Sequence, residues 1–164
     1  MNIFYLHQVA SAAAEMHCDK HVGKMLIETC QLLATAHHTH GNGLAVSYRP
    51  THVNHPCALW VRSSKLHYEW TVKLGRGLGL EFQARYGRFH KSHQVLIEEL
   101  TLAPPQLTQT GWIDPPLVMP DSFKGSDPIE SYRHYYASKS QTMPMTYYRG
   151  TIPPPDWLWE LWRD

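Results

Sequence analysis

Hydrophobic residues recur at helical spacing over most of the chain, and clusters of Gly, Pro and other turn formers separate these stretches. The predicted helices cover residues 9–38, 57–86, 91–102 and 127–140, with a short helical turn after Pro155. A break near Cys18–Asp19 is expected in the first helix, because aspartate often caps the start of a helix. Gly75, Gly77 and Gly79 weaken the middle of the second helix, so a kink or close helix packing is expected there.

The stretches outside the long helices differ in character. Asn2–Leu6 is a short apolar run that predicts a brief strand or an extended leader packed on the core. Residues 38–56 and 103–125 are rich in Pro and other turn formers, which predicts a loop and a long irregular crossing. The last long helix starts at Asp127, with proline next and glutamate three residues after this cap. The pattern predicts one mainly α-helical, compact domain over residues 1–164, with long Pro/Gly-rich loops and an aromatic C-terminal tail.

Composition excludes several classes of protein. A hydrophobic fraction of 43% and a charged fraction of 18% over 164 residues suit one globular domain and exclude a disordered chain. Three cysteines without CxxC spacing favour a reducing cytoplasm, that of the host cell if the protein is phage-encoded. No stretch approaches the roughly 20 apolar residues of a membrane span, and the first residues lack the features of a signal peptide. A membrane partner is therefore not expected.

The formal net charge of +1 conceals an uneven distribution of charge. Residues 1–61 carry no net charge, residues 62–93 carry +5, and residues 94–164 carry −4. The basic middle region interleaves cations with histidines and aromatic residues, which is typical of surfaces that bind phosphates and exposed bases. The alternative is a solvated helix face whose charges meet the acidic tail within the molecule. The candidate contacts to phosphate or DNA are Asn54, His55, Arg85, Arg88, His90, Lys91 and Arg133.

Titratable and hydrogen-bonding side chains form one stripe on the first long helix, if that helix is continuous from His17. At about 100° per residue the stripe is about 80° wide, beside an apolar face that would pack on the core. It is predicted to line a cleft and act in catalysis. The alternative is a surface stripe stabilised by i,i+4 pairs. The residues of the stripe are His17, His21, Lys24, Glu28 and Gln31.

A metal site is a further alternative at the same place. His17 and His21 have the i,i+4 spacing with which two imidazoles on one helix face bind Zn²⁺. A ligand from the following loop would have to complete the site, at His52, His55 or Cys57. The glutamate of an HExxH motif is absent, so no cofactor is the expectation and zinc is the alternative.

Three segments resemble a group of small phage-borne proteins. They are IFYL…AAAEMHCDKHVGKMLIETCQLLATAHH, NHPCALWVRSS…RYGRFHKS and SYRHYY…YYRG. The layout of this group is similar to that of the phage pyrimidine-dimer DNA glycosylases of the endonuclease V type. That family is a single compact α-helical domain with a histidine-bearing first long helix and an aromatic C-terminal segment of W-Y-x-Y-Y-G type. The corresponding features here are His17, the loop Pro50–Pro56 and Tyr147-Tyr148-Arg149-Gly150.

The resemblance implies an amine that attacks DNA with the help of a glutamate on a helix. The family uses the amine of a small second residue, freed by removal of the initiator methionine. Here the second residue is Asn2, before which methionine is expected to stay. With His17 aligned, Lys24 stands where the family has its glutamate, and Glu28 lies one turn further along the same face. Lys24 or Lys20 is therefore expected to form a Schiff base, with Glu28 as its acid–base partner.

These observations lead to three hypotheses with DNA or a nucleotide as the partner. The first is a DNA-directed enzyme of the base-excision type, similar to a DNA N-glycosylase and AP lyase, or one that processes a modified base. The second is a hydrolase or transferase that acts on a nucleotide or another small molecule, with or without a metal at His17 and His21. The third is a non-catalytic DNA-binding phage accessory protein.

Overall fold

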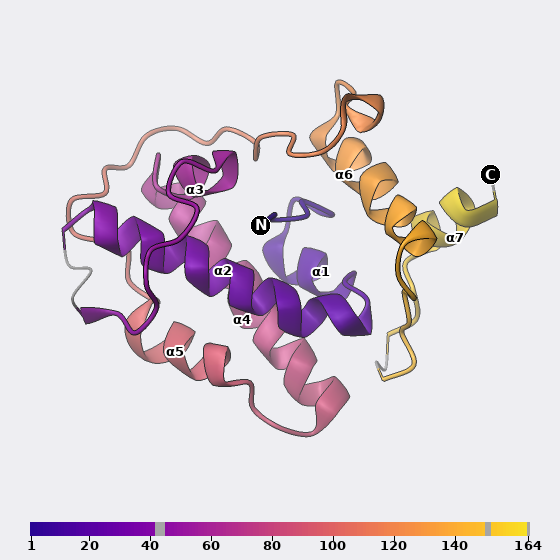
Figure 1. Ribbon diagram of the computed structural model, residues 1–164, viewed down its shortest axis with the longest axis horizontal. Coiled ribbons are helices and arrows are strands. Elements are labelled where there is room, and N and C mark those ends of the chain that lie inside the picture. The colour runs from indigo at the N-terminus through magenta and orange to yellow at the C-terminus, as the bar shows by residue number, and fades with distance from the viewer. Residues whose placement is uncertain (42–44, 150–151, 164) are drawn as a thin grey trace.

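The computed structural model describes residues 1–41, 45–149 and 152–163, and the regular elements within these ranges are all helical. In chain order (Figure 1) they are α1 (Ala10–Glu15), α2 (Asp19–Thr39), α3 (Pro56–Val61), α4 (Lys65–Tyr86), α5 (Lys91–Glu99), the 3-10 turn η2 (Asp121–Phe123), α6 (Pro128–Ala137), the 3-10 turn η3 (Ser138–Gln141) and α7 (Asp156–Arg163). The prediction of a mainly α-helical domain is confirmed. Gly43 of the predicted loop and Gly150 of the predicted aromatic segment lie outside the described residues.

The two long helices, α2 and α4, pack against each other at the centre of the molecule, and α1 packs on α4 (Figure 1). Each contributes large apolar side chains to one core, because hydrophobic residues recur along the facing sides. The largest fully buried side chains of these two helices are Met25, Leu26, Leu32, Leu33, Tyr68, Leu74 and Leu78. Burial of each contributes about 1.5–3 kcal/mol, so the α2–α4 contact is a main source of stability.

The three glycines of α4 mark close packing within a continuous helix. A Cβ atom at Gly77 would lie 2.7 Å from the side chain of Ala14 on α1, and one at Gly75 would lie 2.8 Å from Leu96 on α5. At Gly79 a Cβ would overlap the ring of His93. The expectation of close packing is therefore confirmed, because neighbouring elements occupy the space that side chains would need.

Three helix boundaries were predicted from the sequence or differ from the prediction. The expected break in the first helix falls at residues 16–18, where the backbone N–H of Cys18 donates to the hydroxyl of Tyr136 at 2.9 Å. The predicted continuous helix over 57–86 is wrong, because Ser64 begins a new helix and its side chain accepts a hydrogen bond from Leu66 N–H. The predicted cap at Asp127 is confirmed, since its carboxylate accepts two backbone N–H bonds at the start of α6.

The first residues form an extended leader rather than a strand. Residues 2–6 are buried, and the chain start lies in the middle of the molecule, between α2 and α6 (Figure 1). The 103–125 crossing runs along one edge of the molecule to reach α6 (Figure 1). The hydroxyl of Tyr132 on α6 donates to the carbonyl of Pro116 at 2.6 Å, which fixes the crossing to that helix.

Arg85 is a structural residue, which corrects its prediction as a phosphate contact. Its guanidinium is fully buried and pairs with Glu81 at 2.7 Å and with Asp19 at 3.3 Å. It also donates to the carbonyls of His17 at 2.7 Å and Glu15 at 3.1 Å. These bonds join the end of α4 to the α1–α2 break and occupy the donors that a phosphate would need.

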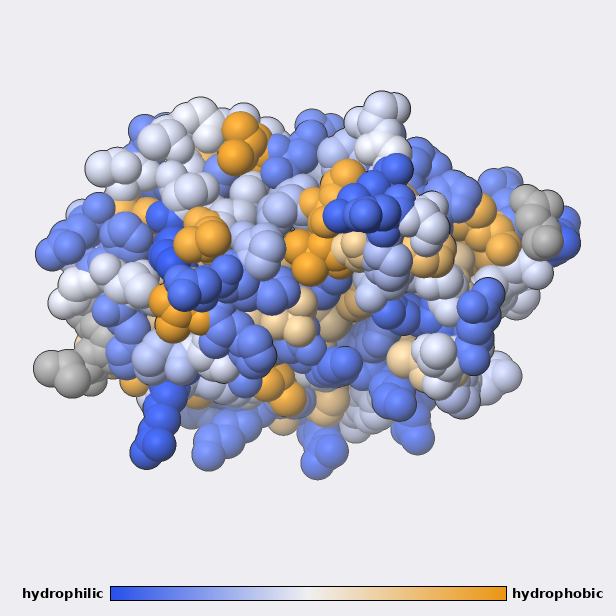
Figure 2. All heavy atoms as spheres, turned by 45° about the horizontal axis from the view of Figure 1, so that its top comes forward, coloured by the Kyte–Doolittle hydropathy of each residue, from blue (hydrophilic) through white to orange (hydrophobic). Residues whose placement is uncertain are grey.

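No helix in the described ranges is long and apolar enough to cross a membrane. Figure 2 shows hydrophobic residues as separate patches among hydrophilic ones on the face that it presents.

Enlarging Gly79 to alanine tests the close packing of α4. Gly79→Ala is expected to lower the free energy of unfolding by about 1–3 kcal/mol, because the new methyl group must displace the His93 ring. Gly111→Ala is the control, since a Cβ there meets no atom within 4 Å. Urea denaturation of both variants measures the difference, and equal stabilities would contradict the packing described.

Candidate functional site

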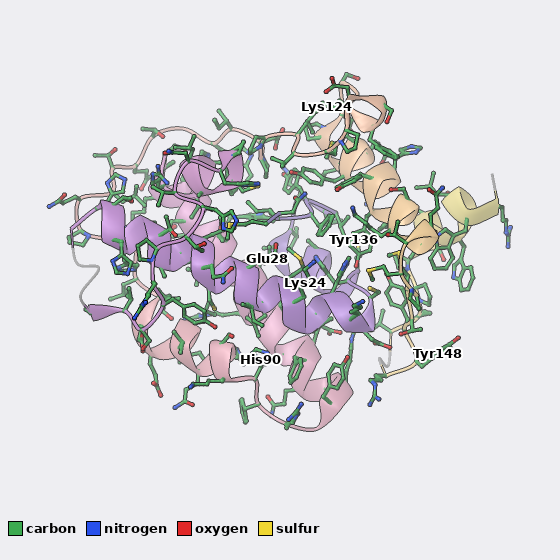
Figure 3. The ribbon with its side chains drawn as sticks, in the orientation of Figure 1. Lys24, Glu28, His90, Lys124, Tyr136 and Tyr148 are labelled. Atoms are coloured by element: carbon green, nitrogen blue, oxygen red, sulfur yellow. The ribbon has the colours of Figure 1, made fainter. Side chains whose placement is uncertain are left out.

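A pocket of about 370 Å³ lies where the N-terminal segment meets α2 and the end of α6. It contains three of the predicted catalytic residues, His21, Lys24 and Glu28. Figure 3 shows Lys24 and Glu28 as neighbours on α2, with Tyr136 on α6. The residues that line the pocket are Met1, Asn2, Phe4, His21, Lys24, Met25, Glu28, Tyr135, Lys139, Thr142 and Met143.

Glu28 is the only carboxylate among these lining residues, and three nitrogen groups converge on it. Its Oε2 lies 3.7 Å from the amino group of Met1 and accepts a 2.9 Å hydrogen bond from the backbone N–H of Asn2. Its Oε1 lies 3.9 Å from the ammonium of Lys24, one turn earlier on α2. The side chain of Glu28 is 15% exposed, whereas that of Lys24 is 61% exposed. The arrangement pairs a primary α-amine with a half-buried acid–base group.

The wall contributed by α6 and η3 carries a second cation. The ammonium of Lys139 donates to the hydroxyl of Tyr135 at 2.7 Å and lies 3.9 Å above that ring. A cation held over an aromatic face keeps its charge and a defined position. Lys139 and Lys24 reach the pocket from different helices, so the mouth can bind an anionic group on either side of the amine.

His21 faces the pocket as a neutral ring. Burial lowers the pKa of His21 to about 3, with nearby cationic groups adding to the effect. Nδ1 of His21 lies 3.0 Å from the hydroxyl of Tyr136, which also accepts a hydrogen bond from Cys18 N–H. A neutral imidazole has one donor and one acceptor nitrogen, so the His21 ring can both donate and accept a hydrogen bond.

His17 is not a member of the stripe, which corrects its prediction as a catalytic residue and as a zinc ligand. Because α2 begins only at Asp19, the His17 ring lies in the break and its Nδ1 pairs with the carbonyl of Ala13 at 2.7 Å. The residue is fully buried, and its Nε2 has no hydrogen-bond partner among the residues that the structure describes. No cluster of three or more potential ligands for a metal occurs in the described part of the chain. The zinc alternative at His17 and His21 therefore lacks the ligands to complete it.

The other two predicted catalytic residues lie near the pocket but do not line it. Lys20 is exposed on the first turn of α2, and its charge contributes to the lowered pKa of His21. Gln31 is half-buried one turn beyond Glu28. Only the middle of the predicted stripe, His21, Lys24 and Glu28, therefore lines the pocket.

The predicted phosphate contacts separate into different surfaces. His55 caps α3 by accepting a hydrogen bond from Cys57 N–H, and its ring interacts electrostatically with Met1 and Glu28. Asn54 and Lys91 are exposed, the former beside this cap and the latter at the start of α5. The structure therefore brings His55 toward the pocket without making it a lining residue.

A group of cations and aromatic rings lies beside α2 at Gly23. The guanidinium of Arg88 lies 5.9 Å above the Phe82 ring, and His90 meets the same ring edge-on at 4.7 Å. Arg149 lies 5.0 Å above Tyr86, which itself stacks on Phe82. A Cβ at Gly23 would come within 3.2 Å of Phe82, so this group adjoins the helix that carries Lys24.

Arg133 has two of its five N–H donors bonded within the protein. Its Nε donates to the carbonyl of Leu6 at 3.1 Å, its Nη1 donates to Glu130 at 3.2 Å, and its guanidinium lies over Trp157. Its part as a phosphate contact stays a prediction, since neither of these bonds uses Nη2.

Four polar or terminal residues of the pocket, Met1, Asn2, Tyr135 and Lys139, are not among the predicted catalytic residues. Tyr135 and Lys139 have i,i+4 spacing at the end of a predicted helix, a pattern that placed an aromatic ring and a cation on one face. Met1 and Asn2 had no comparable signal, since nothing local indicates that the chain start returns to α2.

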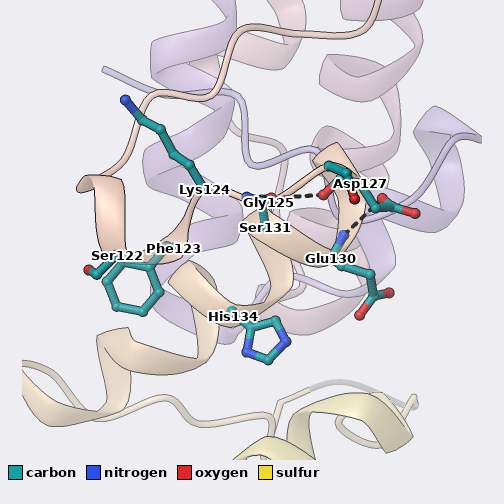
Figure 4. A pocket seen from close by; sticks show the side chains of 9 residues that line it. Ser122, Phe123, Lys124, Gly125, Asp127, Glu130, Ser131 and His134 are labelled. Carbon is teal, nitrogen blue, oxygen red and sulfur yellow. Dashed lines mark hydrogen bonds between the residues drawn. The ribbon is translucent and has the colours of Figure 1, made fainter.

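A larger depression of about 580 Å³ lies at the start of α6 and beside η2 (Figure 4). It contains none of the predicted catalytic residues. The Asp127 carboxylate caps α6 and Lys124 pairs with Asp121 at 2.7 Å, so its charged groups serve local structure. The smaller pocket at Glu28 is therefore the better candidate on chemical grounds.

No protein-family model matches this chain, and no curated protein or solved structure matches it. Inferences about its function rest on the chemistry of the pocket: an amine, a carboxylate, a neutral histidine and two lysines.

Acid is expected to destabilise the protein through its buried histidines. Burial lowers the pKa of His17 to about 4, whereas an unfolded histidine takes up a proton near pH 6.5. Between those values the unfolded state binds the extra proton, so the free energy of unfolding falls as the pH is lowered. His17→Asn is expected to reduce this slope by about 1.4 kcal/mol per pH unit, measured by urea denaturation from pH 6.5 to 4.5. An unchanged slope would show that His17 is not held neutral.

Proposed function

We propose that this protein is a DNA-directed base-excision enzyme, an N-glycosylase with AP-lyase activity, and that the α-amine of Met1 is its nucleophile. The proposal is carried by one observation: the Met1 amine lies 3.7 Å from the half-buried Glu28 carboxylate, within a pocket. An amine beside a general base is the pair that covalent catalysis at a sugar carbon requires. The resemblance to the pyrimidine-dimer DNA glycosylases supports the same chemistry.

The Met1 amine is a better nucleophile in this setting than the lysine expected from the sequence. An α-amine is intrinsically less basic than a lysine, so more of it is unprotonated at neutral pH. The side chain of Met1 is 2% exposed, whereas Lys24 projects mainly into solvent. In this proposal Lys24 supplies a positive charge beside the reacting groups, and Lys20 does not line the pocket.

The proposed reaction begins with attack of the amine nitrogen on C1′ of the target nucleotide. The C1′–base bond breaks, its electron pair leaves with the base, and Glu28 accepts the proton that the amine loses. Glu28 then gives this proton to O4′ as the C1′–O4′ bond breaks, and the nitrogen lone pair forms a protonated imine between Met1 and C1′. The Glu28 carboxylate takes a proton from C2′, the electron pair of that C–H bond forms a C2′–C3′ double bond, and the C3′–O bond breaks so that the 3′-phosphate leaves with its electron pair. Water then adds to C1′ and releases the amine, with the sugar left as an aldehyde. His21 lines the pocket as a neutral ring and is available for a hydrogen bond with the opened sugar.

Charge around the pocket supports DNA as the partner. Lys24 and Lys139 line the pocket from two helices, and Arg88 and Arg149 lie over aromatic rings beside α2 at Gly23. Several cations around one helix can contact successive phosphates of a DNA backbone. The basic middle region and the pocket then belong to one interface.

Borohydride trapping on a duplex with a single abasic site tests the proposal. Reduction of the imine is expected to link the protein to DNA, with the new bond on the Met1 nitrogen when the adduct is mapped by mass spectrometry. Glu28→Gln is expected to lower the trapping rate by about 100-fold or more, because the general base is lost. Glu98→Gln, an exposed position on α5, is the control.

Two further variants distinguish the amines. A Gly-Ser extension before Met1 moves the α-amine out of the pocket and is expected to abolish trapping, whereas Lys24→Arg is expected to retain it. Trapping that survives the extension and disappears in Lys24→Arg would transfer the role to the lysine. A complete absence of trapping by the unaltered protein on abasic and base-damaged duplexes would refute the proposed function.

Salt dependence tests the DNA interface separately from the chemistry. Lys24→Ala and Lys139→Ala are each expected to reduce the slope of log affinity against log salt by about 0.9, the effect of one lost phosphate contact. Lys124→Ala is the control, because that lysine pairs with Asp121 away from the pocket. Fluorescence anisotropy with a labelled duplex gives the slopes. Affinity that is insensitive to salt would favour a nucleotide or another small molecule as the substrate.

A further inference from the structure

Asn2 makes hydrogen bonds in three directions at the start of the chain. Its Oδ1 accepts from the backbone N–H groups of Ile3 at 2.7 Å and Phe4 at 3.2 Å. Its Nδ2 donates to the carbonyl of Val118 at 2.9 Å, and its backbone N–H donates to Glu28 at 2.9 Å. The residue is 9% exposed, so these bonds are largely shielded from water.

The turn that Asn2 closes is a strained one. Phe4 adopts a φ of 49°, in the left-handed region that a residue with a large side chain rarely occupies. Its ring stacks on His21 at 5.4 Å and meets Tyr136 edge-on at 5.0 Å, and this packing opposes the strain. The turn is thus held by the Asn2 amide at one side and by aromatic packing at the other.

The bond from Asn2 to Val118 ties the chain start to a different part of the fold from Glu28. Val118 lies in the 103–125 crossing, which Tyr132 of α6 holds through the carbonyl of Pro116. Glu28 belongs to α2. Asn2 therefore connects the 103–125 crossing with α2, and the amine of Met1 lies between these two parts of the fold.

We infer that Asn2 is the positioning residue of this site and that its side-chain amide holds the Met1 amine against Glu28. The catalytic consequence rests on the proposed function, but the position of the amine is a property of the free protein. Without the amide bonds, the backbone at residues 1–4 is released from both the turn and the crossing. Displacement of a reacting group by about 1 Å can cost about 100-fold in rate.

The test uses Asn2→Leu, which matches asparagine in size but neither accepts nor donates a hydrogen bond. The control is Tyr5→Phe, which removes the other side-chain bond from this segment to the crossing, at Asp114, and leaves Asn2 intact. Intact mass first establishes that each variant begins with the same residue, and circular dichroism establishes that it is folded.

The first measurement needs no DNA. Acylation of the α-amine by a small succinimidyl ester, followed by peptide mass spectrometry, is expected to be about fivefold faster or more in Asn2→Leu, because the amine is released from the pocket in which Met1 is held beside Glu28. Tyr5→Phe is expected to react at the rate of the unaltered protein. Equal rates in all three proteins, or the same increase in both variants, would overturn the positioning role.

The second measurement is borohydride trapping on the abasic duplex. In Asn2→Leu the rate at saturating DNA is expected to fall about 10- to 100-fold, while the half-saturating DNA concentration stays within about threefold. Trapping by Asn2→Leu at the rate of the unaltered protein would overturn the catalytic consequence. If no protein traps but acylation changes as expected, the proposed function fails while the positioning of the amine by Asn2 stands.

Discussion

The half-buried carboxylate of Glu28 decides where the first residues of the chain lie. A charged group removed from water needs partners, and Glu28 finds them in the Met1 amine, the Asn2 N–H and Lys24. This requirement draws the chain start between α2 and α6, where the pocket forms. The same contact brings together the amine and the carboxylate that we propose as nucleophile and base, so one ion pair would serve both the fold and the proposed reaction.

Much of the fold could be predicted from local patterns in the sequence. Hydrophobic spacing predicts the helices, the cap residue Asp127 predicts the start of α6, and three glycines predict the close packing of α4. The break before Ser64 could not be predicted from hydrophobic spacing, because the residues around it favour helix. The start of α4 depends on one side chain, the Ser64 hydroxyl that accepts a hydrogen bond from Leu66 N–H. Local patterns also fail to show that the crossing returns the chain to α6, which depends on long-range bonds such as that from Tyr132 to Pro116.

The candidate site was predictable only in part, for a physical reason. His21, Lys24 and Glu28 lie on one uninterrupted helix, so their angular positions follow from helical geometry. The prediction that His17 belongs to the stripe is wrong because the helix breaks beside it. The prediction that Arg85 contacts phosphate is wrong because charge alone cannot distinguish an exposed cation from one buried in an ion-pair network. Met1, Asn2 and Lys139 join the pocket through tertiary contacts, which no spacing along the chain encodes.

A crystal structure of the borohydride-reduced protein on a duplex with one abasic site would test the central claim most directly. We expect continuous density from the Met1 nitrogen to C1′ of the opened sugar, with the Glu28 carboxylate within hydrogen-bonding distance of that nitrogen and Lys24 and Lys139 beside the flanking phosphates. Density that joins the sugar to a lysine, or DNA bound on a face away from the pocket, would contradict it.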